Sequence, residues 1–363
     1  MAADPDLAVT IPSSAATPVL VGHTAALEAF TQAYDSGRMP HAWLFTGRAG
    51  IGKATLAWHG AHYVLSDGRN GPREVDLETP AARLVAAESH PDLIVLRRPM
   101  DEKTGLPRDT LPVEEARKLT PFLSKTATRG GWRVALIEEA ESLNRTGQNA
   151  LLKVIEEPPP KTLILLTAPS VGTLLTTIRS RCRVMPLGPL PPEDVRQALE
   201  RLGAWPTDAR EGQRLVELAR GSPGFALRLR ASGIVPLYED IVAWLAAGSR
   251  GDGGTLHALA DRVSRKADSR AFGLITALIV DMLRCAARAA VLGGGPGGAG
   301  TSAADAHALP AFAARLAASV PAGHLVDLAE RIARLFAEAD TVHLDRKTVL
   351  LNVLGLLKRE AGA

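Results

Sequence analysis

The sequence predicts an α/β domain built on a parallel sheet, followed by a small helical unit and a larger all-helical C-terminal part. Two observations favour this fold class. Through the first half of the chain, short apolar runs alternate with segments of helical periodicity, which is typical of a doubly wound parallel sheet. After a Pro-rich connector near residue 189 the pattern changes, and from about residue 235 onward no segment has the features of a strand.

The predicted boundaries follow from these changes of pattern. We expect a disordered tail over residues 1–17, where Pro, Ser and Ala are frequent. The α/β domain should span residues 18–188, the small helical unit residues 189–232, and the helical C-terminal domain residues 233–363. Within the last part, glycines make residues 292–305 a flexible loop by composition.

Each element of the α/β domain has its own signal. A helix is expected over residues 23–37 because Leu27, Phe30 and Tyr34 recur at helical spacing. Apolar runs predict buried strands at residues 41–47, at 92–98, from 133 onward and at 162–168. Further helices are expected over residues 53–65, 113–123 and 146–157, the last of them stopped by Pro158.

Two signals stand out in the helical parts. The small unit opens with a short helix that has Glu193 and Asp194 in its first turn. The final helix, residues 345–360, has Asp345 as its candidate N-cap. Its apolar stripe indicates either core packing or a subunit contact, and consists of Val349, Leu350, Val353, Leu354 and Leu357.

Composition limits the class of protein. The chain has 363 residues, enough for two or three domains, and a pI near 9.0, which is compatible with nucleic acid nearby. Two cysteines are too few for a disulfide framework or a four-thiolate zinc site, and they favour a reducing cytoplasm. We find neither a signal peptide nor an apolar run of about 18 residues, so we expect a cytoplasmic protein without membrane contact.

The segment "GRAGIGKAT", residues 47–55, follows the first predicted strand and opens a predicted helix. It matches the phosphate-loop pattern G-x-x-x-x-G-K-[ST] up to the last position, where Ala54 replaces the hydroxyl residue that normally holds Mg²⁺. Thr55 comes one residue late, about 100° further round the helix. The predicted contacts of this degenerate nucleotide site are Gly47, Gly50, Gly52, Lys53, Ala54 and Thr55, with Glu138 and Glu139.

Glu138 and Glu139 follow the strand that starts at residue 133. The end of such a strand is where Mg²⁺ and an attacking water would be managed, with Glu138 directed to the metal and Glu139 as a potential base. Glu138 is one methylene longer than the usual Asp, which would displace the metal. The alternative is a polar strand end that makes helix caps and surface ion pairs, and the sequence leaves both interpretations open.

The segment "TIRSRC", residues 177–182, places Arg179 and Arg181 two positions apart after a strand–helix unit. An arginine offered to the γ-phosphate of a neighbouring subunit neutralises charge in phosphoryl transfer. Surface arginines are more often simply solvated, so spacing alone does not decide between the two.

Several motifs follow in order along the chain: "GRAGIGKAT", "HPDL", "LIEEAESLN", "NALLKVIEEPP", "LLTAPS", "TIRSRC" and "GSPGFAL". Over roughly residues 18–230 the chain resembles the delta-prime subunits of bacterial DNA polymerase III clamp loaders, a family of the AAA+ superfamily. The resemblance implies an AAA+ domain, a helical lid and a helical collar. It also implies a stator in a hetero-pentamer with gamma/tau and delta subunits, which loads a sliding clamp on primed DNA. Arg181, with Ser180 and Cys182, would be the arginine finger given to a neighbour's ATP.

Two departures from the motor subunits of that family imply that the chain has no ATPase activity of its own. Ala54 lacks the Mg²⁺ hydroxyl, and Gly224 stands where the resemblance expects a lid arginine that senses the γ-phosphate. No cofactor is therefore expected to be required, and the cysteine-free stretch after the loop helix implies no zinc. Three alternatives stay open: an active gamma/tau-like ATPase, ATP or ADP bound without turnover, and a different phosphate-loop protein such as a small-molecule kinase.

Overall fold

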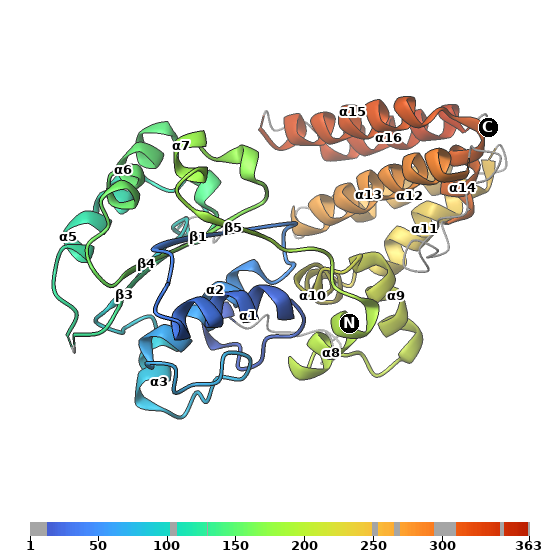
Figure 1. Ribbon diagram of the computed structural model, residues 1–363. Helices are drawn as coiled ribbons and strands as arrows, with labels where there is room; N and C mark the ends of the chain where they lie inside the picture. Colours follow the sequence, from blue (N-terminus) through green and yellow to red (C-terminus); the bar gives the residue numbers. More distant parts are fainter. Residues whose placement is uncertain are drawn as a thin grey trace. The chain divides into compact units, whose positions relative to one another are not determined.

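The computed structural model describes residues 13–101, 107–128, 130–248, 253–264, 269–293, 310–341 and 345–361 (Figure 1). These residues form two compact units, divided in sequence between Leu227 and Arg228. The first unit contains the whole sheet and most of the small helical part, and the second unit is helical. The division falls inside helix α10 (Pro223–Ser232).

Within the described residues, five parallel strands form a sheet in the order β2-β3-β4-β1-β5. The central strands are buried at every position, which explains why the sequence shows them as continuous apolar runs. The four strands that the sequence predicts are all present: β1 (Ala42–Thr46), β2 (Leu93–Leu96), β3 (Arg133–Ile137) and β4 (Thr162–Ala168).

The fifth strand, β5 (Arg183–Pro186), is absent from the sequence-based prediction. It pairs with β1 at the edge of the sheet, with Arg183 opposite Trp43 and Pro186 opposite Thr46. Arg183 and Pro186 are exposed, so the segment has no apolar run that would indicate a strand. Because β5 begins directly after Cys182, the "TIRSRC" segment must lie at the end of the sheet where β5 starts.

Successive residues of the central strands point to opposite faces of the sheet and build two separate cores. Trp43 and Phe45 belong to the core under α1 (Thr24–Asp35), α2 (Lys53–Leu65) and α3 (Pro80–Ala86). Ala42 and Leu44 belong to the other core, covered by α4 (Val113–Arg117), α5 (Leu119–Leu123), α6 (Arg145–Glu156) and α7 (Thr176–Arg179). Figure 1 shows the two groups of helices on opposite sides of the sheet, which confirms the doubly wound arrangement.

The predicted helix over residues 113–123 is wrong in one respect, because it is broken into α4 and α5 at Lys118. Pro121 has no N–H group and cannot donate a hydrogen bond to the carbonyl of Arg117. The series of helical hydrogen bonds is therefore interrupted at Lys118, although the backbone of this residue stays in the right-handed helical region. By contrast, α6 ends at Glu156, two residues before Pro158, as expected.

The predicted tail is ordered at its C-terminal end. Residues 14–16 form a short 3₁₀ helix, η2 (Ser14–Ala16), and Ala15 is fully buried. His62 of α2 lies 3.0 Å from the carbonyl oxygen of Ala15, and His59 lies 3.1 Å from that of Thr17. Two buried imidazoles thus hold this segment on α2, a long-range contact that local composition does not reveal. Residues 1–12 of the predicted tail lie outside the described residues.

The small helical part consists of α8 (Pro192–Arg201), α9 (Ala209–Ala219) and the start of α10. Helices α8 and α9 pack against each other, and Val195 and Leu199 of α8 are buried. A Cβ at Gly212 would lie only 2.4 Å from the ring of Trp205, so this glycine allows the close approach of the indole to α9. A compact apolar core therefore holds these helices together.

The described residues of the second unit contain six helices beyond α10. Helix α13 packs along α15, and α16 contacts α12 and α15. No described helix combines the length and the apolar character needed to span a membrane. The six helices are α11 (Val235–Ala246), α12 (Gly253–Ser264), α13 (Ser269–Gly293), α14 (Ala311–Ser319), α15 (Ala322–Thr341) and α16 (Arg346–Glu360).

Two predictions for the second unit can be compared with the structure. Asp345 accepts hydrogen bonds from the N–H groups of Lys347 and Thr348, so it caps α16 as predicted. The apolar stripe of α16 is buried within the unit, which agrees with core packing. The predicted loop over 292–305 begins inside α13, and its residues 294–305 lie outside the described part of the chain.

Candidate functional site

The phosphate-loop segment connects β1 to α2, the context that the sequence predicts. Three glycines of the loop have positive φ: Gly47 at 152°, Gly50 at 77° and Gly52 at 111°. Side chains rarely adopt these conformations, so the loop depends on glycine at each position. Gly52 is the N-cap of α2, and the nitrogen Nε2 of His23 lies 2.8 Å from the carbonyl oxygen of Ile51.

Lys53 is bonded to its own loop. Its ammonium donates to the carbonyl oxygens of Gly47 at 2.7 Å and Arg48 at 2.9 Å. Burial lowers the pKa of Lys53, and the nearby carboxylates of Glu141 and Glu139 oppose that shift. In this arrangement the ammonium of Lys53 binds carbonyl groups of its own loop, where a bound phosphate would otherwise be its partner. Lys53 therefore stabilises the loop itself.

The small helical part rests directly on the loop. The N–H of Gly224 donates to the carbonyl of Gly50 at 2.8 Å, and the Ser222 hydroxyl donates to the carbonyl of Ala49 at 2.9 Å. A Cβ at Gly224 would lie 2.8 Å from the Cα of Gly50, closer than such atoms come. The glycine at the position of the expected arginine is therefore a requirement of this contact, and Ser222 is its second anchor.

The two residues after Lys53 begin α2. Ala54 packs with its methyl group against the core formed by α1 and α2 and offers no oxygen. Thr55, the next residue, is half-buried on the following part of the helical turn. Ala54 therefore lacks the hydroxyl that would normally complete a Mg²⁺ site beside the loop lysine.

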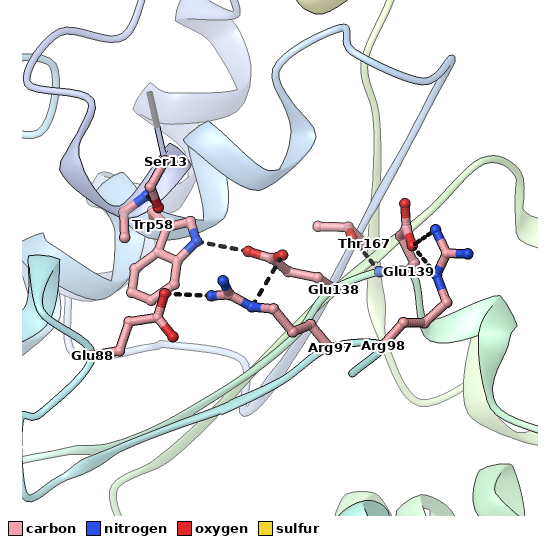
Figure 2. Close-up of polar contacts among 9 residues, drawn as sticks. Ser13, Trp58, Glu88, Arg97, Arg98, Glu138, Glu139 and Thr167 are labelled. Carbon is pink, nitrogen blue, oxygen red and sulfur yellow. Dashed lines mark hydrogen bonds and ion pairs between the residues drawn. The ribbon is translucent and has the colours of Figure 1, made fainter. Parts of the chain in front are cut away.

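Glu138 is engaged by two side chains of the same chain (Figure 2). Its Oε1 accepts a hydrogen bond from the indole Nε1 of Trp58 at 2.8 Å, and its Oε2 lies 3.7 Å from Nε of Arg97. Arg97 also pairs with Glu88, at 2.5 Å. Figure 2 shows Glu138 lying between the indole and the guanidinium.

Glu139 is engaged in the same way by the next arginine. Both Nε and Nη2 of Arg98 lie 2.6 Å from its Oε2. Its backbone N–H donates to the Thr167 hydroxyl at 3.0 Å, and its φ is 52°. Two consecutive arginines at the end of β2 thus face two consecutive glutamates at the end of the neighbouring strand β3 (Figure 2).

These contacts test whether the residues suit a magnesium nucleotide. Mg²⁺ needs near-ideal octahedral oxygen ligands, and phosphates need free N–H groups and a free lysine. Here the loop hydroxyl is missing, the lysine is bonded to loop carbonyls, and each acid is paired with an arginine. The residues present do not fit that group in this conformation.

Arg181 lies between α7 and β5, and 41% of its side chain is exposed. Its Nη2 is 3.0 Å from Oε1 of Glu156, and its Nη1 donates to the carbonyl of Thr177 at 3.1 Å. Ser180 is exposed and donates to the same carbonyl at 3.1 Å. Cys182 packs against the core, where burial raises the pKa of its thiol to about 12. Cys182 therefore anchors the segment while Arg181 is presented to solvent.

Arg181 and the phosphate loop lie at opposite edges of the sheet. In parallel strands the amino ends of all strands meet along one side of the sheet, here called the amino edge, and the carboxyl ends meet along the opposite side. Arg181 comes just before the start of β5, whereas Gly47 follows the end of its partner strand β1. In this register Arg181 is level with His41, six residue steps before Gly47, which is roughly 20 Å along the strands. Arg181 is therefore not brought together with the loop, Glu138 and Glu139 of its own chain.

Several residues of the site are missed by sequence reasoning. In the sequence Arg97 and Arg98 are the last residues of the strand predicted over residues 92–98, and Trp58 lies within the helix predicted over residues 53–65. Their contacts with Glu138 and Glu139 depend on the order of β2 and β3 in the sheet and on the face that α2 presents. One signal in the sequence could have indicated the contact between these arginines and glutamates. A pair of basic residues and a pair of acidic residues each stand at the end of a predicted strand.

Comparison with known proteins agrees with the motifs. The family described as "DNA polymerase III, delta subunit" matches residues 22–191. The DNA polymerase III subunit delta' of Pseudomonas aeruginosa is 40% identical over 196 residues, 53% of this chain and 57% of that protein. The subunit delta' of Escherichia coli is 33% identical over 202 residues, 56% of this chain and 58% of that protein. The chain thus spans a little over half the length of the delta' relatives that it matches.

More distant similarities extend to other subunits. The DNA polymerase III subunit tau of Escherichia coli is 32% identical over 210 residues, which are 56% of this chain but only 30% of that protein. A solved structure of a DNA polymerase III gamma subunit-related protein from Thermotoga maritima aligns with 92% of this chain, at 16% identity and a TM-score of 0.45.

Proposed function

In residues 22–191 the chain belongs to the family of DNA polymerase III delta-prime subunits, and from this premise we propose that it acts as a largely non-catalytic stator of a clamp loader. In this role it supplies Arg181 to the ATP site of a neighbouring motor subunit. The complex it serves opens a sliding clamp and places it on primed DNA.

The position of Arg181 is the observation that supports this function most directly. The side chain is exposed at the amino edge of the sheet, away from the phosphate loop of its own chain. An arginine placed there can reach a nucleotide only if another subunit brings one to it. A guanidinium offered in trans neutralises the charge that develops on the transferred phosphoryl group.

The proposed partners are gamma/tau and delta subunits in a hetero-pentamer, with the clamp and DNA contacted through the complex. The similarity to both delta' and tau subunits supports this assignment, since related subunits of one loader share the same fold family. The proposed location is the cytoplasm, where the replication machinery of a bacterium works.

The chain itself is proposed to need no cofactor. The absence of a hydroxyl at Ala54, the internal bonds of Lys53 and the arginine partners of Glu138 and Glu139 all support this proposal. Zinc is not required either, because Cys182 and Cys285 are the only cysteines of the chain and lie far apart in sequence. The contact of Ser222 and Gly224 with the loop supports a rigid first unit.

The test is reconstitution with motor and delta subunits and measurement of clamp- and DNA-stimulated ATP hydrolysis. Arg181→Ala should lower ATP turnover at the neighbouring site by about 10³-fold. The rate of ATP hydrolysis by the whole complex should therefore fall by at least the fraction that this site contributes to it. The matched control is Arg179→Ala, since Arg179 is exposed and forms no ion pair with the described residues. Equal rates for the two variants would contradict the proposed function.

A further inference from the structure

We propose that two side chains of α6, Gln148 and Glu156, are positioning residues for Arg181. Gln148 fixes the start of α7 and Glu156 holds the guanidinium, so one helix aligns both ends of the segment that presents the arginine. This inference rests on the proposed function and deepens it.

Gln148 is a buried bridge between α6 and α7. Its Oε1 accepts a hydrogen bond from the backbone N–H of Leu175 at 2.9 Å, and its Nε2 donates to the carbonyl of Leu143 at 3.0 Å. Leu175 is the residue that precedes α7. A helix of one turn has no stability of its own, so its direction must come from such tertiary contacts.

Glu156 acts at the other end of the same segment. It is the last residue of α6, about eight residues or 12 Å along the helix from Gln148. Its carboxylate meets Nη2 of Arg181, while Nη1 of Arg181 meets the carbonyl of Thr177. The guanidinium is therefore held between an acceptor on α6 and an acceptor on α7.

This arrangement restrains the guanidinium and leaves part of it available. Arginine has five N–H donors. The contacts with Glu156, Thr177 and the Ser180 hydroxyl, the last at 3.4 Å, use three of them. Two donors, including the one on Nε, have no partner among the described residues and can meet a phosphate. Restraint of a long side chain before contact reduces the ordering that contact would otherwise require.

Stability alone gives no reason for the ion pair. Both side chains are 41% exposed, and exposed pairs of this kind contribute little to folding. Removal of Glu156 should therefore leave the fold intact and change only how Arg181 is presented. This separates a positioning role from a structural one.

The experiment is a double-mutant cycle in the reconstituted clamp loader, with kcat and KM for ATP as the two readouts. The decrease in kcat caused by Glu156→Gln should be more than half of the decrease caused by Arg181→Ala. The KM for ATP should not change. Gln148→Leu should act in the same direction. In the Arg181→Ala background neither substitution should lower the rate further. The control is Glu157→Gln, which removes a neighbouring exposed carboxylate that makes no ion pair with the described residues.

Each other outcome overturns the inference. If Glu156→Gln equals the control while Arg181→Ala is impaired, the positioning role fails and the proposed function stands. Further loss in the Arg181→Ala background would indicate a structural role, and faster hydrolysis would indicate that Glu156 restrains the arginine from acting. If Arg181→Ala itself has no effect, the proposed function and the inference fail together. Because Glu156 is exposed, its variant tests the idea even if Gln148→Leu does not fold.

Discussion

Among single residues, His59 combines burial with an unusual set of neighbours. Its Nδ1 lies 3.1 Å from the carbonyl oxygen of Pro72 and its Nε2 lies 3.1 Å from that of Thr17. Burial lowers the pKa of His59 to about 4, and this outweighs the two carbonyls, which favour the protonated ring. His62, one turn further along α2, has its pKa lowered by burial in the same direction.

The shift at His59 predicts a loss of stability in mild acid. The folded pKa is below the unfolded value of about 6.5, so the unfolded state binds more protons between pH 6.5 and 4. The free energy of unfolding should fall by about 2 kcal/mol from this residue between pH 7.5 and pH 5. Chemical denaturation at both pH values measures it. His59→Gln keeps one donor and does not titrate, so an unchanged pH dependence in that variant would refute the assignment.

The sequence indicates which residues form the site better than it indicates what they contact. Gly47, Gly52 and Lys53 are recognised from spacing, because a phosphate loop is a local pattern. The partners of Glu138 and Glu139 come from β2, α2 and β4, and no local pattern encodes which strand lies beside which. The choice between a metal site and ion pairs, open in the sequence, depends on that neighbourhood.

At the level of elements, the contact between α10 and the phosphate loop depends on two glycines. Gly50 and Gly224 approach so closely that a methyl group on either would meet backbone atoms of the other segment at 3.0 Å or less. The hydroxyl of Ser222 adds a second bond to the loop. The loop is thus covered by Ser222 and the start of α10, which belong to the same unit as the loop.

We predict that Gly224→Ala separates α10 from the loop. Overpacking of this kind costs about 1–3 kcal/mol, which should appear in chemical denaturation and as faster hydrogen exchange at the amide of residue 224. Gly188→Ala is the control, because a Cβ there meets open space and its backbone needs no positive φ. Equal effects of the two substitutions would show that the close approach is not important.

Secondary structure is predicted well where packing and local pattern agree. The central strands and α6 follow directly from apolar runs, helical spacing and Pro158. The prediction fails at Lys118, where Pro121 interrupts a helix whose apolar spacing continues past it, and at β5, where an edge strand needs no apolar face. Both failures occur where a backbone hydrogen bond, or its absence, outweighs the side-chain pattern.

At the level of the whole molecule, the sequence separates an α/β domain from a helical lid at residue 188, and this boundary stays a prediction. In the structure the α/β part and the small helical part as far as Leu227 lie in one compact unit. Hydrogen bonds from Ser222 and Gly224 to Ala49 and Gly50 join them. Composition marks the connector between two parts, but it does not show that they pack as one body.

The phosphate loop is occupied by contacts with Lys53, Ser222 and Gly224 of the same chain. We therefore predict that nucleotide does not stabilise the chain against unfolding. A ligand at a concentration equal to its Kd adds about 0.4 kcal/mol to folding, and one at 100 times its Kd adds about 2.7 kcal/mol. With about 5 mM MgATP we expect no measurable rise in the unfolding temperature, relative to MgCl₂ at matched ionic strength. Ala54→Thr should not restore a rise, because Lys53, Glu138 and Glu139 keep their partners. A clear upward shift in the natural chain would mean that nucleotide binds.

The opposite placement of Arg181 and the phosphate loop gives this subunit a direction. A head-to-tail row of related subunits grows because each member donates at one end and receives at the other. On the proposed function, this chain donates an arginine but holds no nucleotide on which an incoming arginine could act. It can therefore begin such a row and cannot continue it. The number of subunits in the row would then be limited by a site that performs no reaction.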